Sequence, residues 1–412
     1  MNQLKVNLFK AYYDARKNKR NTYNQLKFEI NYEQELLKLY EEIKNKTYKV
    51  GKSIAFIINK PVKREIFAAN FRDRVIHHLI FNYINPILEP QFINDSYSCR
   101  KGKGTHYGIK KANQYINEVS QNYSTDAYIL KLDIKGYFMS INKVLLMQKL
   151  QKMITKQVFD KYIYENTNGK TDQDIDFDSL FILINEIISN NPTIDCTIKG
   201  HTKDWESLPD SKSLFKSNPD CGLPIGNLTS QLFSNVYLND FDHYMKTQLG
   251  YKYYGRYVDD FFVMSTSMNE LKLLIHSIHN YLKANLDLKL HPKKIHLQHY
   301  TKGIQYLGVF INPYRIYIGN RTKNKFKKCL YYLSKFLKQK KVLTFKNLNY
   351  ILSVINSYLG LFSHYKTYKL RNALLFRSKP CFLYRLGYFD VNLIKFTTNK
   401  SLIINNQIHL LK

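Results

Sequence analysis

With 412 residues, 44% hydrophobic and 15% aromatic, the chain has enough apolar residues to bury a large core, spread over about two to four domains. This composition excludes a disordered basic tail protein, because such chains lack the aromatic residues that offset the entropy cost of ordering. The formal net charge of +31 favours a polyanionic partner, with nucleic acid ahead of an anionic membrane surface.

The first third of the chain predicts, in order, a helical extension, a β-strand, a buried helix and a second strand. Residues 1–50 carry apolar residues at helical spacing and predict a helical extension. A β-like run from Ser53 to Asn59 is ended by Pro61, and the apolar pattern of residues 72–90 predicts a buried helix. Residues 128–134 (YILKLDI) predict a short core strand that enters a loop.

Residues 156–220 differ from the rest of the chain because acidic residues outnumber basic ones, 12 to 7. The local balance is −5, so the other residues together carry +36. We expect this acidic insert to face away from a polyanion or toward a basic protein partner. Its tryptophan, Trp205, is either an interface anchor or part of the core of the insert, and both interpretations stay open.

Residues 320–400 form the most basic stretch, with 18 Lys and Arg against one acid, Asp390. Within it, FKNLNYILSVINSYLGLFSHY has apolar residues at helical spacing and basic residues on both flanks. This pattern predicts a C-terminal helical domain that packs one face on a core and turns a basic face to phosphates.

The five cysteines lie far apart without a Cys-x-x-Cys pair, which predicts a reduced intracellular protein with no structural zinc site. The N-terminus lacks the apolar stretch of a signal peptide, and the most apolar run, SLFILINEIIS, is interrupted by Asn185 and Glu186. We therefore expect a cytoplasmic protein without a membrane span.

The strongest local feature is GRYVDDFFVM, residues 255–264, in which two β-rich runs flank Asp259 and Asp260. The pair is predicted at a hairpin tip. Adjacent carboxylates repel and raise the pKa of one another, and a divalent cation between them removes this penalty. Asp133, at the end of an apolar strand, is the candidate third ligand. Three such acids could bind two Mg²⁺ for an in-line nucleotidyl transfer.

YVDD, preceded by LKLDIKGYF and by GLPIGNLTSQLFSNVYLN, resembles the motif series of reverse transcriptases across about residues 50–312. The resemblance implies an α+β fold, the right-hand polymerase with fingers, an antiparallel palm sheet and a helical thumb. It divides the chain into an N-terminal helical extension (1–50), fingers (51–127), palm with the first carboxylate (128–155), acidic insert (156–220), palm with the YVDD hairpin and primer grip (221–317), and basic helical thumb with C-terminal tail (318–412). Since the chain ends soon after the thumb, we expect no RNase H, endonuclease or maturase region.

The resemblance also implies the reaction, in which a primer 3′-OH attacks a dNTP on an RNA template to extend a cDNA. Asp133, Asp259 and Asp260 would be catalytic and, with the carbonyl of Ile134, would hold two Mg²⁺, for which Mn²⁺ can substitute. Phe138 falls where the family places a steric gate against the ribose 2′-OH, although a buried aromatic would look the same in sequence.

KPVKREIFAANFRDR resembles the strand pair of the fingers that grips the incoming triphosphate. Lys60 and Arg64 are the expected phosphate contacts, with Lys63 as a competing choice and a solvated basic hairpin as the other interpretation. In HPKKIHLQ, Lys293 or Lys294 would lie near the leaving pyrophosphate, and Lys293 is the residue we assign.

Primer and template contacts are expected in three places. KGIQYLGVFI resembles the primer grip, with Tyr306, Leu307 and Gly308 in a hairpin. The loop DSYSCRKGKGTH is basic and rich in glycine, which suits Lys101 and Lys103 for contact with a phosphate backbone. Tyr257, in the YVDD motif, is the remaining expected contact.

The motif LPIGNLTSQ departs from the common family pattern. Most members have Gln where this chain has Ile225, and Pro where it has Gln231. Ile225, beside Gly226 at the expected dNTP site, can pack but cannot hydrogen-bond, so selection of the correct base should weaken.

This version of the motif is similar to reverse transcriptases of diversity-generating retroelements in bacteria and phages. It implies error-prone copying of template adenines for mutagenic retrohoming, and a basic helical accessory protein as a partner. The alternative is a defence-associated bacterial reverse transcriptase that uses a noncoding RNA template or none. A nonenzymatic RNA-binding protein is the more distant alternative, against which the three acids argue.

Overall fold

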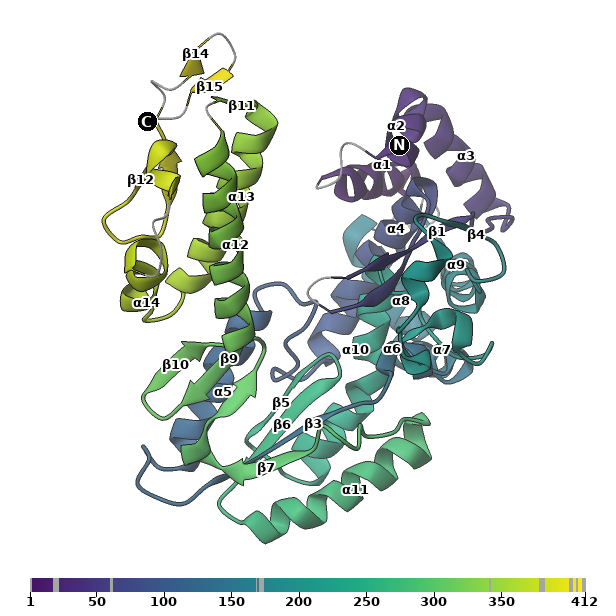
Figure 1. Cartoon of the computed structure of the whole chain (residues 1–412). Coiled ribbons are helices and arrows are strands. Elements are labelled where there is room, and N and C mark those ends of the chain that lie inside the picture. Colours follow the sequence, from purple (N-terminus) through teal and green to yellow (C-terminus); the bar gives the residue numbers. More distant parts are fainter. Residues whose placement is uncertain are drawn as a thin grey trace. The chain divides into compact units, whose positions relative to one another are not determined.

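The computed structural model describes residues 2–17, 22–59, 62–167, 169, 174–340, 342–377, 382–399, 403–404 and 407–409 (Figure 1). The chain forms two compact units: Met1–Gly108 with Leu130–Leu297, and Ile109–Ile129 with Gln298–Lys412. The boundaries of these units fall inside two strands, β3 (Tyr128–Asp133) and β7 (His296–His299). No helix in the described part of the chain combines the length and the apolar character needed to cross a bilayer.

The first unit begins with the predicted helical extension, which is confirmed. It consists of α1 (Gln3–Arg16), α2 (Tyr23–Ile30) and α3 (Tyr32–Lys44). Both α1 and α2 contact α4 (Phe71–Leu88), the predicted buried helix. Val75, Ile76, Leu79 and Ile80 of α4 are fully buried, so this helix forms the core of the region.

A three-stranded sheet follows in the order β2-β1-β4. Strands β1 (Ser53–Ile58) and β2 (Arg64–Ala68) are antiparallel, and β4 (Cys196–Ile198) pairs with β1 in parallel. Because β4 belongs to the acidic insert, the insert adds a strand to the β1–β2 hairpin. The insert also contains α8 (Lys156–Thr167) and α9 (Phe177–Ser189), both of which contact α4.

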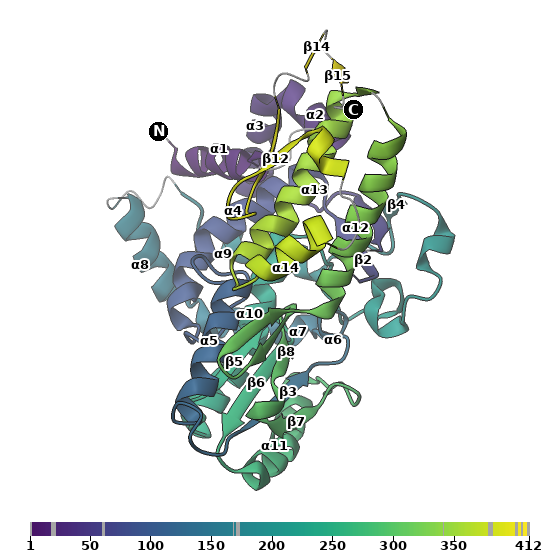
Figure 2. The same cartoon turned by 60° about the vertical axis from the view of Figure 1, so that its left-hand side comes forward.

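The central sheet has the strand order β5-β6-β3-β7 (Figures 1 and 2). Strands β5 (Tyr254–Tyr257) and β6 (Asp260–Ser265) form the predicted antiparallel hairpin. Two helices, α10 (Leu228–His243) and α11 (Met268–Leu286), contact one another, and α11 contacts β6. Four consecutive residues of β6, from Phe261 to Met264, are buried, so this strand lies in the core of the unit.

The remaining helices of the first unit are short. They are α6 (Tyr137–Ser140), α7 (Lys143–Met153), the 3₁₀ helices η1 (Glu89–Gln91), η3 (Thr202–Trp205), η4 (Asp210–Lys212) and η5 (Leu214–Lys216), and the π-helical turn η6 (Tyr244–Gln248). Helix α5 (Thr105–Val119) starts in the first unit and continues into the second.

The second unit contains a three-stranded meander and the C-terminal helices. The strands are β8 (Ile304–Tyr306), β9 (Val309–Asn312) and β10 (Arg315–Ile318), and the helices are α12 (Asn320–Gln339), α13 (Phe345–Ser363) and α14 (Tyr368–Asn372), with short helical turns η7 (Tyr300–Lys302), η8 (Ala373–Arg377) and η9 (Phe382–Arg385). Figures 1 and 2 show α12 and α13 side by side. The predicted helices of the C-terminal segment are confirmed.

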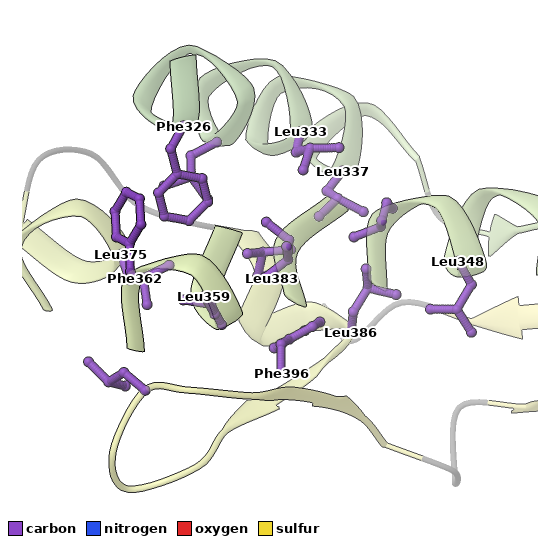
Figure 3. Close-up of a cluster of buried hydrophobic side chains, with 14 of the residues drawn as sticks. Phe326, Leu333, Leu337, Leu348, Leu359, Phe362, Leu375, Leu383, Leu386 and Phe396 are labelled. Carbon is purple, nitrogen blue, oxygen red and sulfur yellow. The ribbon is translucent and has the colours of Figure 1, made fainter. Parts of the chain in front are cut away.

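This segment is not purely helical, however, because five short strands accompany its helices in the part that the structure describes. They are β11 (Val342–Leu343), β12 (Gly387–Phe389), β13 (Phe396–Thr398), β14 (Ile403–Ile404) and β15 (Gln407–His409). Phe396 of β13 joins Phe326, Leu337 and Phe362 of α12 and α13 in one apolar core (Figure 3). The strands have two or three residues each, too few for an alternating pattern to show in sequence.

Candidate active site

The acidic pair lies at the hairpin turn where the sequence places it. Tyr257 and Asp260 are paired across β5 and β6, so Val258 and Asp259 are the two residues of the turn. Val258 has a φ of +57°, which a β-branched residue rarely adopts. The turn is therefore strained, and the surrounding structure must hold it.

Arg256 holds this turn from the buried side of the hairpin. Its Nη1 donates a hydrogen bond of 2.9 Å to the carbonyl oxygen of Val258. Its Nε and Nη2 donate to the two carboxylate oxygens of Asp242 at 2.7 and 2.5 Å, and both side chains are fully buried. The hydroxyl of Ser98 accepts a hydrogen bond from the Val258 amide at 3.1 Å. Arg256 was not predicted, and a charged residue between glycine and tyrosine in a buried strand was the signal available.

Asp133 is brought to the same place by the neighbouring strand. In the sheet, β3 lies next to β6, and the amide of Ile134 donates a hydrogen bond of 3.1 Å to the carbonyl oxygen of Asp259. The carbonyl oxygen of Asp133 accepts a hydrogen bond from the His291 amide at 2.8 Å. The structure thus brings together Asp133, Ile134, Asp259 and Asp260, which the sequence predicts as one group.

The electrostatics of the three carboxylates agree with this proximity. Burial, and then the charge of Asp133, raise the pKa of Asp259 to about 6. Burial also raises the pKa of Asp260 to about 6, with Lys131 opposing the shift and Asp133 adding to it. The charge of Asp133 therefore makes ionisation of both Asp259 and Asp260 less favourable, as expected for a site that needs a cation.

Two lysines supply positive charge at the site. Lys294 Nζ lies 2.7 Å from Asp133 Oδ2, and Lys131 Nζ lies 3.0 Å from Asp260 Oδ1. Lys294, rather than Lys293, therefore contacts a carboxylate, while Lys293 is exposed. A pyrophosphate contact by Lys293 stays a prediction. Lys131 was not predicted, although it lies two residues before Asp133 and so points to the same face of β3.

The donor atoms fit a divalent cation. Carboxylate and carbonyl oxygens are the ligands that hard cations prefer, and Asp260 Oδ1 is buried without accepting a hydrogen bond of good geometry despite the nearby Lys131. Within the described residues, no three His, Cys, Asp or Glu side chains are already arranged as a metal site. Lysine ammonium groups instead neutralise two of the acids.

The residues predicted around the incoming nucleotide also converge. Phe138 and Ile225 are half-buried and pack against one apolar cluster that contains Phe67 of β2. The Phe67 amide donates a hydrogen bond of 3.0 Å to the carbonyl oxygen of Ile225. Gly226 has a φ of +129°, and a Cβ there would lie 3.2 Å from the carbonyl oxygen of Phe67, so a glycine suits this close approach.

The three basic residues considered for phosphate contact in the predicted fingers differ in their surroundings. Arg64 begins β2, is exposed, and lies opposite Ile58 in the hairpin. Lys63 donates hydrogen bonds through Nζ to Glu206 and Ser207 of the insert. Lys60 lies outside the described residues. Phosphate contacts by Lys60 and Arg64 stay predictions.

The predicted template loop lies next to the acidic hairpin. The Thr105 hydroxyl donates a hydrogen bond of 3.5 Å to the Tyr257 hydroxyl, which joins the loop to β5. Lys101 is exposed, whereas Lys103 donates to the carbonyl oxygen of Asn94 at 2.9 Å, and burial lowers the pKa of Lys103 to about 8.

The predicted primer grip belongs to the second unit. Tyr306 ends β8 and is buried, and Leu307 and Gly308 form the two-residue turn to β9 with φ of +46° and +90°. The amide of Gly319, just before α12, donates a hydrogen bond of 3.1 Å to the carbonyl oxygen of Gly308. The hairpin is confirmed, and its contact with a primer stays a prediction.

The chain is similar to known proteins over more than half of its length. Protein YkfC of Escherichia coli (strain K12) is 21% identical over 270 residues, an alignment that covers 58% of this chain and 60% of that protein. The chain thus spans about 60% of the length of this curated relative.

Among solved structures, apo telomerase from Candida tropicalis is similar with a TM-score of 0.46 and 12% identity, over 79% of this chain and 59% of that chain. Telomerase from Candida albicans, in complex with a TWJ fragment of telomeric RNA, has a TM-score of 0.41 and 13% identity, over 82% and 58%. The family model described as reverse transcriptase (RNA-dependent DNA polymerase) matches residues 58–311. Because this match covers more than half of the chain, the protein belongs to the reverse transcriptase family.

Proposed function

We propose that this chain is an RNA-directed DNA polymerase that copies an RNA template into cDNA. The observation that carries the proposal is the convergence of Asp133, Asp259 and Asp260 at the end of β3 and the β5–β6 turn, in a member of this family. Its substrates are dNTPs, a primer end and the RNA template.

Reverse transcriptase domains generally use divalent metal ions, and we propose Mg²⁺ here, with Mn²⁺ as a substitute. The three carboxylates and the Ile134 carbonyl would hold two ions. Bound there, the ions supply positive charge to the attacking 3′-oxygen and to the leaving pyrophosphate. The strained turn at Val258 fixes the direction of Asp259 and Asp260, so the carboxylates are positioned before substrate arrives.

The residues around Ile225, together with nearby basic residues, are the proposed contacts of the incoming nucleotide. Phe138 would exclude a ribose 2′-OH, and Arg64, Lys60 and Lys293 would neutralise phosphate charge. The basic C-terminal segment, predicted as the thumb, would hold the template–product duplex through its phosphates.

The site is tested by replacing Asp259 and Asp260 together with Ala. We expect Mg²⁺-dependent dNTP incorporation on an RNA template to be lost, while RNA binding remains, because the acids face the cation and not the phosphate backbone. Asp160→Ala, an exposed acid of α8, is the matched control and should polymerise as the wild type does. Incorporation at the wild-type rate by the double variant would refute the active-site assignment.

We further propose that copying is error-prone at template adenines, as expected for mutagenic retrohoming in a diversity-generating retroelement. The support is Ile225, whose side chain packs on apolar residues beside Phe138. An isoleucine there offers no hydrogen bond to the incoming nucleotide. The basic helical accessory protein implied by the same resemblance is part of this proposal.

This second proposal predicts that Ile225→Gln lowers misincorporation opposite adenine, because the amide can hydrogen-bond the nucleotide only when it is correctly placed. Sequencing of cDNA made by both proteins on one RNA template measures the effect. Ile225→Leu, which keeps an apolar side chain, should retain the wild-type error spectrum. An error spectrum that Ile225→Gln leaves unaltered would remove Ile225 from the account of fidelity.

A further inference from the structure

One attachment of the acidic insert to the predicted fingers is a buried carboxylate, that of Glu65. Glu65 of β2 is only 1% exposed, and both of its oxygens accept hydrogen bonds from the insert. Trp205 Nε1 and the Ser213 hydroxyl donate to Oε2 at 2.6 and 2.7 Å, and the Leu214 amide donates to Oε1. All three donors lie between residues 205 and 214 of the insert, so Glu65 alone accepts three hydrogen bonds from that segment.

The same segment of the insert contacts the β1–β2 hairpin at two more places. Strand β4 pairs with β1, and the Lys199 amide donates a hydrogen bond of 2.9 Å to the carbonyl oxygen of Ala55. Just before β2, Lys63 Nζ donates a hydrogen bond to the carbonyl oxygen of Glu206. The hairpin is thus held along β1 and at both sides of Arg64, the residue that we expect at the triphosphate.

The same segment of the insert also contacts residues that are predicted to line the site of the incoming nucleotide. Trp205 and Leu214 pack in the cluster that also contains Phe138 and Ile225. The carbonyl oxygen of Ser211 lies so near Gly136 that a Cβ there would be 2.5 Å away. Gly136 precedes α6, the helix that carries Phe138.

We infer that residues 196–216 of the insert are a brace that fixes β2 against the Ile225–Gly226 loop, and that Trp205 and Glu65 are positioning residues for the incoming nucleotide. This inference rests on the proposed polymerase function. The brace acts on β2, which carries the Glu65 and Phe67 side chains on one face and whose Phe67 amide donates the hydrogen bond to the carbonyl oxygen of Ile225. The sequence left two interpretations of Trp205 open, an interface anchor or part of the core of the insert. The brace supports the first, with the interface lying within the chain.

The test compares Trp205→Phe with the wild type. Phenylalanine keeps an aromatic ring beside Phe215 but removes the donor to Glu65. We expect the KM for dNTP to rise by roughly fivefold to tenfold, less than the full loss of one hydrogen bond to a charged group, because only part of that loss reaches the nucleotide site. The affinity for RNA should not change, because the substitution removes no charge that could pair with a phosphate. Tyr164→Phe, which removes one exposed hydroxyl elsewhere in the insert, is the matched control.

Hydrogen exchange gives a second measurement that does not depend on activity. Amide exchange in residues 64–68 should be faster in Trp205→Phe than in wild type, and unchanged in the control. Ser213→Ala, a milder loss of a donor to the same carboxylate, should show the same direction of change.

The outcomes separate the two proposals. A wild-type protein that fails to polymerise would refute the proposed function, and hydrogen exchange would still test the brace. A wild-type protein that polymerises, together with Trp205→Phe at an unchanged KM and unchanged exchange, would refute the brace alone. If Trp205→Phe does not fold, Ser213→Ala decides by the same two measurements.

Discussion

Asp259 has a raised pKa because the fold buries it and places Asp133 beside it. Its side chain makes no ion pair with any residue that the structure describes, whereas Asp133 and Asp260 each pair with a lysine. The ionised form of Asp259 therefore costs free energy in the folded protein unless a cation is bound. This cost is the physical basis for expecting metal binding to stabilise the fold as well as to support the reaction.

The pKa of about 6 makes the stability of the metal-free protein depend on pH. Because a raised carboxyl pKa means that the folded state holds its proton more tightly than the unfolded state, the stabilisation is complete below about pH 4 and is lost as pH rises through about 6. We expect Asp259→Asn to be more stable than wild type at pH 7 in EDTA, and the difference to shrink toward pH 4.

Thermal unfolding from pH 4 to pH 8 measures this difference. Adding Mg²⁺ at pH 7 should stabilise wild type more than Asp259→Asn, since the variant lacks one ligand. Asp160→Asn, at an exposed position, should follow the wild-type curve. A constant difference between wild type and Asp259→Asn across this pH range would contradict the raised pKa.

The β5–β6 hairpin depends on a buried ion pair behind its turn. Arg256 and Asp242 are fully buried, and Asp242 also accepts a hydrogen bond of 2.6 Å from the Tyr254 hydroxyl. A buried pair of this kind adds little net stability over an apolar pair, but loss of one partner leaves an uncompensated charge. The Val258 carbonyl gives Arg256 a second role, because it fixes the direction of the turn.

We therefore predict that Arg256→Met destabilises the protein by about 3–5 kcal/mol, the usual cost of an isolated buried charge. The double variant Arg256→Met with Asp242→Leu should recover much of this stability, since no charge remains buried. Polymerisation should stay low in the double variant, because the Val258 carbonyl still lacks its donor. Denaturant unfolding and dNTP incorporation measure the two effects, and full activity in a stable double variant would refute the positioning role.

The sequence predicted those elements whose pattern is local. Strands β1 and β3, helix α4 and the acidic hairpin have long apolar runs or turn residues within one short segment. The contacts of Arg256 with Ser96, and of Glu65 with Trp205, join residues far apart in the chain. No single-segment pattern reports such pairs, so the support behind the turn and the brace appeared only with the fold.

The charge of the molecule is uneven in a way that suits a polymerase. The buried apolar residues of the C-terminal segment pack in one core, and the lysines of α12 lie on the other faces of that helix. The acidic insert belongs to the first unit, where it contacts β1 and β2. The insert thus has a net negative charge, while the C-terminal segment offers an excess of basic residues to a polyanion.

Four lysines of α12 test whether that surface is the nucleic-acid contact: Lys323, Lys325, Lys327 and Lys328. Replacing them with Gln should reduce the slope of log K against log salt for RNA binding by about 0.7 to 0.9 for each lysine that contacts a phosphate. Binding measured between low and moderate salt gives the slope. The same substitution at four exposed lysines of the N-terminal helices, Lys10, Lys27, Lys38 and Lys44, removes equal charge and should leave the slope nearly unchanged. Equal changes in both variants would mean that net charge, and not α12, determines the binding of RNA.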